Sequence, residues 1–339
     1  MRNRTNTIVG WLVVIALFVA VQPLYKQIDY ERVVLGYAPP TTVTKVLQYD
    51  APAMTGVIVG AMLGGFREVA ASMMWMKTHS MWHAGEGTQW DALSLMRITT
   101  LLDPHWLEPW RITAWHCAYN LFVETDDPVK KTDLLETGVN VLKEGISWNP
   151  DRYDLYFELG WTYFDKIRDY EQASRWLEAS LRFEHPEFVE RMIAHSWERL
   201  PDIDRALEWY DYCLKSRPND HTAIGATITI RERYLPAWQA MQERRFDEAL
   251  ALTDEYLRVA PDATIPQHLK ALIYERAGDY ERALNQWQMA ADTAALNAHA
   301  RAKVAHLSEL LGRPVPAEPS YLYRQRMLER SGEKQAPAP

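Results

Sequence analysis

The sequence predicts an all-α protein, an α-solenoid of about six helix pairs with a transmembrane helix at its N-terminus. The first observation is a small residue followed by a proline 12 or 13 residues later, at Ala92/Pro104, Gly138/Pro150, Ala173/Pro186, Ala206/Pro218 and Ala249/Pro261. The second is a further small residue, Ala283, placed 34 residues after Ala249. The third is an unbroken apolar run over residues 8–21.

The spacing of small residues and prolines indicates a helix that recurs with a fixed end. A helix needs a small side chain where its backbone lies close to a neighbouring helix, and it ends before a proline that cannot continue it. Recurrence at about 34 residues is typical of helical repeat proteins.

The copy at residues 267–290 shows the pattern most clearly. Its regularly spaced small and aromatic residues are Ala271, Tyr274, Ala283, Trp287 and Ala290. Gly278 and Asp279 interrupt the helix between the two groups, which predicts two antiparallel helices. These residues resemble the tetratricopeptide repeat (TPR), whose first helix carries a small residue and Tyr and whose second carries Ala, an aromatic residue and Ala.

The resemblance covers residues 73–296 as six degenerate copies. The copy containing Gly160, Tyr163 and Asp169 has one extra residue in its turn, and the copies at 73–104 and 106–150 are the weakest. The repeat implies a TPR-like solenoid over 73–311, followed by a Pro-rich and partly disordered C-terminal tail over 312–339. It implies no particular activity, because such scaffolds have many different partners.

The N-terminal 24 residues predict a membrane anchor. Arg2 and Arg4 precede the apolar run, whereas the segment after it is about neutral, so the N-terminus is expected in the cytoplasm. We therefore expect a single-pass protein of the inner (cytoplasmic) membrane with its solenoid on the extracytoplasmic side. A cleaved signal peptide is the alternative, since the run is shorter than an average span of about 20 residues.

Residues 25–72 are expected to form a membrane-proximal linker and a glycine-rich helix. The apolar stretch 51–66 contains Gly56, Gly60 and Gly64 on one helical face, which allows another backbone to approach closely. It is either a helix that caps the solenoid or a second membrane-associated helix. A second full span would return the solenoid to the cytoplasm.

The composition and the motifs favour a non-enzymatic protein without a cofactor. A net charge of −8 argues against nucleic-acid binding, which needs a basic face. No GxSxG, HExxH, P-loop or GxGxxG sequence occurs. A metal-dependent enzyme that uses His79, His83 and His116 is the third-ranked alternative, because no carboxylate completes that set at a recognisable spacing.

The repeat resemblance implies a concave groove lined by the first helix of each pair. The residues that it places there are Lys77, Met81, Arg111, Trp115, Tyr119, Phe157, Trp161, Phe164, Arg191, His195, Arg199, Tyr234 and Trp238. Aromatic side chains and arginines dominate binding hot spots, so the set predicts an interface for a protein or peptide.

Two functions are therefore expected, in order. The first is a membrane-anchored scaffold that binds a protein or peptide partner in the groove. The second is a structural subunit or assembly factor of a larger membrane complex, in which the groove is permanently filled. The stretch 63–67, with Trp75 and the segment 101–104, is similar to a group of bacterial membrane-anchored TPR proteins of unassigned role.

Overall fold

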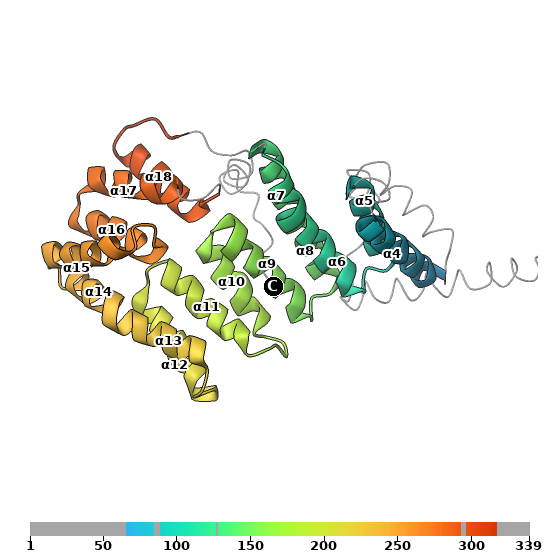
Figure 1. Cartoon of the computed structure of the whole chain (residues 1–339), viewed down its shortest axis with the longest axis horizontal. Coiled ribbons are helices and arrows are strands. Elements are labelled where there is room, and N and C mark those ends of the chain that lie inside the picture. Colours follow the sequence, from blue (N-terminus) through green and yellow to red (C-terminus); the bar gives the residue numbers. More distant parts are fainter. Residues whose placement is uncertain (1–65, 85–88, 127, 293–295, 317–339) are drawn as a thin grey trace, which may run out of the picture. The chain divides into compact units, whose positions relative to one another are not determined.

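The structure is a computed structural model that describes residues 66–84, 89–126, 128–292 and 296–316 (Figure 1). The described residues form helices and turns, and none of them lies in a strand. The all-α prediction is therefore confirmed for this part of the chain.

Six helix pairs follow one another along the described chain, as predicted. The first is α4 (Arg67–Ala84) with α5 (Gln89–Leu102). In the second, α6 (Leu107–Trp115) continues through the π-helical turn η2 (His116–Leu121) into α7 (Phe122–Glu124), and its partner is α8 (Pro128–Trp148). The third is α9 (Tyr153–Thr162), extended by the π-helical turn η3 (Tyr163–Ile167), with α10 (Tyr170–Ser180).

The remaining pairs complete the repeat. The fourth is α11 (Phe188–Arg199) with α12 (Ile203–Ser216). In the fifth, α13 (His221–Thr229), η4 (Ile230–Tyr234) and α14 (Leu235–Gln242) follow one another and precede α15 (Phe246–Val259). The sixth is α16 (Thr264–Ala277) with α17 (Tyr280–Asp292), and α18 (Ala298–Leu310) packs against α17.

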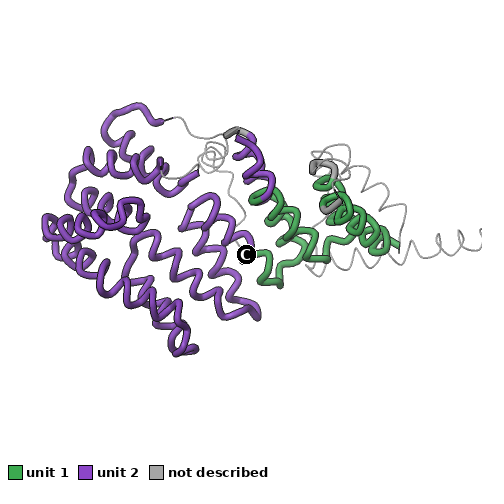
Figure 2. Tube along the Cα trace, viewed as in Figure 1, with its two compact units in different colours: residues 1–119, 140–155 green, residues 120–139, 156–339 purple. Residues whose placement is uncertain are grey.

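The chain divides into two compact units, which are described separately (Figure 2). Unit 1 comprises residues 1–119 and 140–155, and unit 2 comprises residues 120–139 and 156–339. Unit 1 is organised around Trp110, which is fully buried and donates its Nε1–H to the carbonyl oxygen of Pro104 at 2.9 Å. A Cβ atom on Gly145 would lie 3.0 Å from the Trp110 ring, so the glycine allows α8 to approach it.

Close helix crossings explain the small residues in unit 2. A Cβ atom on Gly160 of α9 would lie 2.8 Å from Cγ of Leu177 on α10, too close without a shift of one helix. Ala194, Ala206 and Ala283 are fully buried on the helices of the later pairs. The small positions of the repeat are therefore places where two helices touch.

The turns within the pairs also follow a common plan. The side chains of Asp169 and Asp202 each accept a hydrogen bond from a backbone N–H of the following helix and so cap its start. The residue before the second helix's cap lies in the left-handed region at Arg168 (φ 56°), Arg244 (φ 61°) and Gly278 (φ 79°). Left-handed backbone normally favours glycine, so the two arginines are held there at an energetic cost.

The membrane predictions fall largely outside the described residues. The predicted anchor 1–24 lies there, as do residues 25–65, which leaves Phe66 as the one described residue of the apolar stretch 51–66. Among the helices from α4 to α18, none is both long and apolar enough to cross a bilayer. The first described helix, α4, begins at Arg67, within the stretch that the sequence assigns to the linker 25–72.

Candidate functional site: the inner face of unit 2

In unit 1, the predicted groove residues differ widely in exposure. The side chain of Trp115 is 43% exposed, and its ring stacks on that of Tyr119 with centroids 5.9 Å apart. Lys77 is exposed, Met81 is half-buried, and Arg111 lies 3.6 Å from the carboxylate of Glu108 on the same helix. For these residues the groove stays a prediction, and the stacked pair Trp115 and Tyr119 is its most exposed aromatic part.

In unit 2, three predicted aromatic residues lie on α9 and η3 and are partly exposed. Trp161 and Phe164 stack with centroids 5.8 Å apart, and Phe157 makes an edge contact with Phe188 of α11 at 5.1 Å. Phe164 in turn contacts the ring of Tyr170, which begins α10, at 5.6 Å. Trp161, Phe164 and Tyr170 therefore form one row of contacting rings, and Phe157 and Phe188 form a separate pair. Trp161 and Phe164 are partly exposed.

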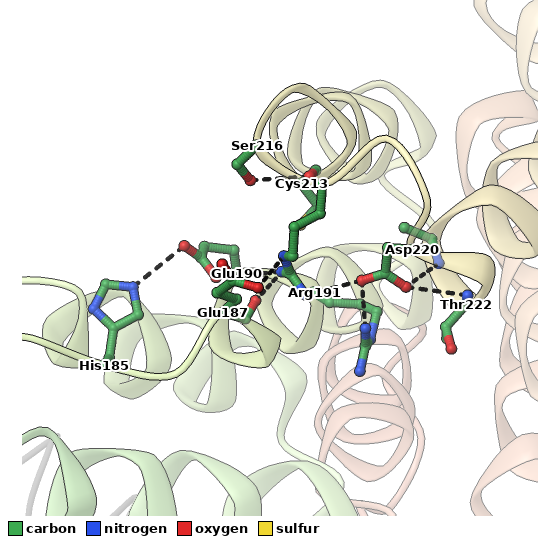
Figure 3. A network of polar contacts seen from close by, with 10 residues as sticks. His185, Glu187, Glu190, Arg191, Cys213, Ser216, Asp220 and Thr222 are labelled. Carbon is green, nitrogen blue, oxygen red and sulfur yellow. Dashed lines mark hydrogen bonds and ion pairs between the residues drawn. The ribbon is translucent and has the colours of Figure 1, made fainter.

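Arg191, predicted in the groove, belongs to a network of ion pairs at the start of α11 (Figure 3). Its guanidinium lies 2.5 Å from Oδ2 of Asp220, which also accepts from Arg217 at 3.1 Å. Arg217 reaches the carboxylate of Glu187 at 2.9 Å, and His185 lies 3.3 Å from Glu190. The charge of Arg191 is thus used inside the fold.

Asp220 connects this network to the next repeat. Its Oδ1 accepts backbone hydrogen bonds from Thr222 and Ala223 at 3.1 Å and caps α13. Burial by itself would raise the pKa of Asp220, but the Ala223 bond and the charges of Arg191 and Arg217 lower that pKa below its usual value. The network therefore holds α11, the end of α12 and α13 together.

His195, also predicted in the groove, is tied to the buried core of its own pair. Its Nδ1 lies 2.6 Å from the hydroxyl of Tyr210, and that hydroxyl donates to Oε2 of Glu198 at 2.9 Å. Burial, followed by the charge of Glu198, raises the pKa of Tyr210 strongly, so the phenol stays protonated. His195 therefore has a structural partner on one ring nitrogen.

The placement of Tyr234 and Trp238 on an open surface is wrong. Both are buried in one hydrophobic cluster with Leu269 and Ile273 of α16. The indole Nε1–H of Trp238 donates to Oδ2 of Asp204 at 2.9 Å. The physical reason is that α16 packs against α14 and covers these side chains.

The helices of unit 2 also contact each other across the inner side of the stack. His268 of α16 donates its Nδ1–H to the carbonyl oxygen of Arg199, at the end of α11, over 2.9 Å. The backbone N–H of His299 in α18 donates to the carbonyl oxygen of Arg168 over 3.1 Å. Because these helices belong to pairs that are not neighbours in sequence, the predicted groove is partly filled by the protein itself.

Four rings meet where these helices converge, and we call them the inner ring cluster: Tyr170, His268, Trp287 and His299. The centroids of His268 and His299 are 5.4 Å apart, and each lies about as close to Trp287. Tyr170 lies 6.2 Å from His268 and so joins the cluster to the row that contains Phe164.

The inner ring cluster holds its two histidines in the neutral form. The pKa of His268 is lowered to about 4, mainly by burial. The charges of Arg199 and Arg168 also lower this pKa, whereas the hydrogen bond to the Arg199 carbonyl raises it. Burial also lowers the pKa of His299 well below its usual value, with contributions from His268 and Lys303. With Nδ1 of His268 donating, its buried Nε2 is an acceptor without a partner among the described residues.

Two arginines at the edge of this cluster have no carboxylate partner. Neither the Arg168 nor the Arg199 guanidinium makes an ion pair or a side-chain hydrogen bond within the described chain, and both are half-buried. The charges of both act on Tyr170 and His268, which places them at one site. The arrangement can therefore bind an anionic group beside the open rings of Trp161 and Phe164.

No metal site emerges from the described residues. No group of three or more His, Cys, Asp or Glu side chains among them is arranged to hold a metal ion. Of the three histidines considered for that role, His79 is exposed and His116 is buried with its ring against Trp82 at 3.5 Å. The side chain of His83 lies outside the described part of the chain.

The sequence pattern missed Arg168, Tyr170, His268 and His299. One signal was present, because the single extra residue in the turn between Gly160 and Asp169 is taken up by η3, a π-helical turn that is wider than an α-helical one. Such turns are frequent at functional sites. Nothing in the sequence indicates that His268 and His299 meet this turn, because they lie 100 and 131 residues away from Arg168.

Comparisons with known proteins bear on the fold. No protein-family model matches the chain, and no curated protein matches it significantly in sequence. Solved structures that are similar include a thermophilic TPR protein from Thermus thermophilus, at 18% identity over 52% of this chain and 96% of that one, with a TM-score of 0.37.

Two further similar solved structures are also TPR proteins. YrrB, described as a TPR protein with an unusual peptide-binding site, is 18% identical over 61% of this chain and 97% of its own, with a TM-score of 0.30. The TPR domain of P58(IPK) is 11% identical over 90% and 99%, with a TM-score of 0.35. The predicted resemblance to the TPR family is confirmed at the level of the repeated helix pair.

Proposed function

We propose that this protein is a membrane-attached scaffold whose unit 2 binds an acidic segment of a protein partner. The observation that carries the proposal is a pair of arginines, Arg168 and Arg199, that form no ion pair with any described carboxylate and lie near the partly exposed rings of Trp161 and Phe164. A half-buried guanidinium without a counter-charge attracts a carboxylate, which it binds through two parallel hydrogen bonds. Aromatic rings next to it supply apolar contact area.

The proposed binding surface is smaller than the predicted groove. Arg191, Tyr234 and Trp238 are engaged in the fold and are left out of the binding surface. What remains is a short surface that runs from Trp161 to Arg199 along the edge of the inner ring cluster. A surface of this size suits a peptide segment better than a whole folded domain.

Site-specific crosslinking tests this surface. A photo-crosslinking phenylalanine analogue is placed at Phe164 in the full chain and, as a control, at Tyr212, which is 54% exposed on α12. In native membranes the Phe164 probe should capture a partner, and the captured peptide should be rich in Asp and Glu. Capture of a neutral or basic peptide, or equal capture from Tyr212, would refute the proposed surface.

The membrane attachment is proposed from the N-terminal sequence alone. The apolar run 8–21 and the preceding Arg2 and Arg4 support a retained anchor in the inner membrane, with residues 25–339 on the extracytoplasmic side. Mass spectrometry of membrane-extracted protein should find the N-terminal peptide, and protease added to intact spheroplasts should digest unit 2. A mature chain that begins near residue 21 would contradict the anchor.

A further inference from the structure

One face of α4 exposes several large apolar side chains close together, whereas other described helices expose them singly. Phe66, directly before α4, is 54% exposed, and Val69, Met73 and Met76 are 56%, 58% and 64% exposed. Steps of three, four and three residues place them on one side of a helix. We call these four residues the apolar stripe of α4.

The opposite side of α4 is already occupied by the fold. Ala71 and Thr78 are buried where α4 packs against α5, and Arg67 donates from its guanidinium to the carbonyl oxygen of Leu101 at 3.0 Å. The apolar stripe is therefore not the side by which α4 joins unit 1. A helix that is apolar on both sides is expected where both sides are covered.

The position of α4 in the chain indicates what covers the second side. It begins directly after the apolar stretch 51–66, which contains no charged residue and is the part of the chain predicted to meet the membrane. From residue 66 to 76 a helix extends about 15 Å, half of the roughly 30 Å hydrocarbon core. That length suits a helix lying in the bilayer surface.

We propose that the apolar stripe of α4 inserts into the surface of the lipid bilayer, with α4 lying along the membrane plane. The proposal rests on the membrane attachment proposed above and adds a second contact, on the folded part of the chain. Lys77 is exposed next to the end of the stripe, where an ammonium group meets lipid phosphates. The stripe would thereby fix the side of unit 1 that faces the membrane.

The test uses the full chain in phosphatidylcholine–phosphatidylglycerol vesicles. Met73→Cys carries an environment-sensitive fluorophore, and Ser147→Cys, exposed on α8 of the same unit, carries it as the control. The natural thiols compete little for the label, because burial raises the pKa of Cys117 to about 12 and that of Cys213 to about 11. Vesicle flotation measures attachment in the same sample.

We expect the probe at position 73 to shift to the blue, to lose its quenching by aqueous iodide and to be quenched by nitroxide-labelled lipid. The probe at position 147 should show none of these changes. If the chain floats with the vesicles but iodide still quenches position 73, the α4 contact is wrong and the attachment stands. Protection from iodide without quenching by labelled lipid means that protein covers the stripe, which also overturns the proposal. A chain that does not float contradicts the attachment itself.

Discussion

Both ends of α11 carry an arginine, but only the arginine at its start forms an ion pair within the described chain. At its start, Arg191 lies 2.5 Å from Asp220 within a network in which each charged group has a counter-charge (Figure 3). At its end, Arg199 contacts His268 of the inner ring cluster through its carbonyl oxygen, and its guanidinium makes no ion pair within the described chain. Both were assigned to the same groove by their positions in the repeat. The difference shows that position in the repeat does not reveal which arginine forms an ion pair within the fold.

The largest expected effect comes from removing Asp220, the carboxylate that Arg191 and Arg217 share at the start of α11. Asp220→Ala should lower the free energy of unfolding by about 4 kcal/mol, because it leaves Arg191 and Arg217 without their shared carboxylate and removes the cap of α13. Urea unfolding followed by tryptophan fluorescence measures this. Arg199→Ala is the matched control and should change stability by less than about 1 kcal/mol. Equal losses would mean that the two ends of α11 do not differ.

The two ends should also respond to acid at different pH values. Buried His268 has a pKa of about 4, against about 6.5 in an unfolded chain, so unfolding takes up a proton between these values. Above about pH 6.5, His268 is neutral in both states and does not reduce the free energy of unfolding. As the pH falls to 4, that free energy decreases by roughly 3 kcal/mol. The Asp220 pKa is lowered, so the stability that it contributes is lost only below its ordinary value near 3.8.

Unfolding midpoints at pH 7.5 and pH 5 test this contrast. His268→Asn retains an amide donor toward the Arg199 carbonyl but does not titrate, so it should reduce the loss of stability at pH 5. An unchanged pH dependence would show that His268 is not neutral and buried in the native protein.

Arg199, at the end of α11, should contribute more to partner affinity than Arg191 at its start. Once the partner segment is known, Arg199→Ala should weaken its affinity by about 2 kcal/mol, roughly thirtyfold, and more at low salt than at high salt. Isothermal titration at two salt concentrations measures both effects. Arg191→Lys keeps a cation beside Asp220 and should leave the affinity unchanged. A similar loss for both variants would return Arg191 to the binding surface.

The smallest expected effect distinguishes the role of the Arg168 guanidinium from that of its left-handed backbone. Arg168→Gly and Arg244→Gly both relieve a left-handed residue in the turn of a helix pair, so each should change stability by no more than about 1 kcal/mol. Arg168→Gly alone should weaken partner binding, because only its guanidinium lies beside the inner ring cluster. If Arg244→Gly weakens binding equally, the effect arises from the turn and not from the charge.

The helix pairs were predictable because their causes are local. Ala283 and Gly160 lie at helix crossings, and prolines such as Pro218 follow the end of a helix. Both effects act within one helix pair. The proposed binding surface was only partly predictable. Trp161 and Trp238 occupy the same position in their repeats, yet Trp238 is covered by α16 and Trp161 stays partly open.

The remaining features depend on contacts between distant parts of the chain. The pairing of Arg191 with Asp220 spans 29 residues, and the contact of His299 with Arg168 spans 131. The repeat pattern describes each pair and its neighbour but not which pairs meet again across the inner side. The exposed apolar stripe of α4 was equally hidden, because its sequence is apolar on both sides and does not say which side packs against α5.

The hydrogen bond from His299 to the Arg168 carbonyl makes unit 2 a closed arrangement of repeats. In an open array each repeat touches only its neighbours, so repeats can be added, removed or unfolded one at a time. Here α18, the last described helix, must be in place before the hydrogen bonds of the turn at Arg168 are complete. An inserted or deleted repeat would move these two groups apart, so the number of repeats in unit 2 is fixed by geometry. Unit 2 should accordingly unfold as a single cooperative block, more slowly assembled than a linear solenoid of the same length.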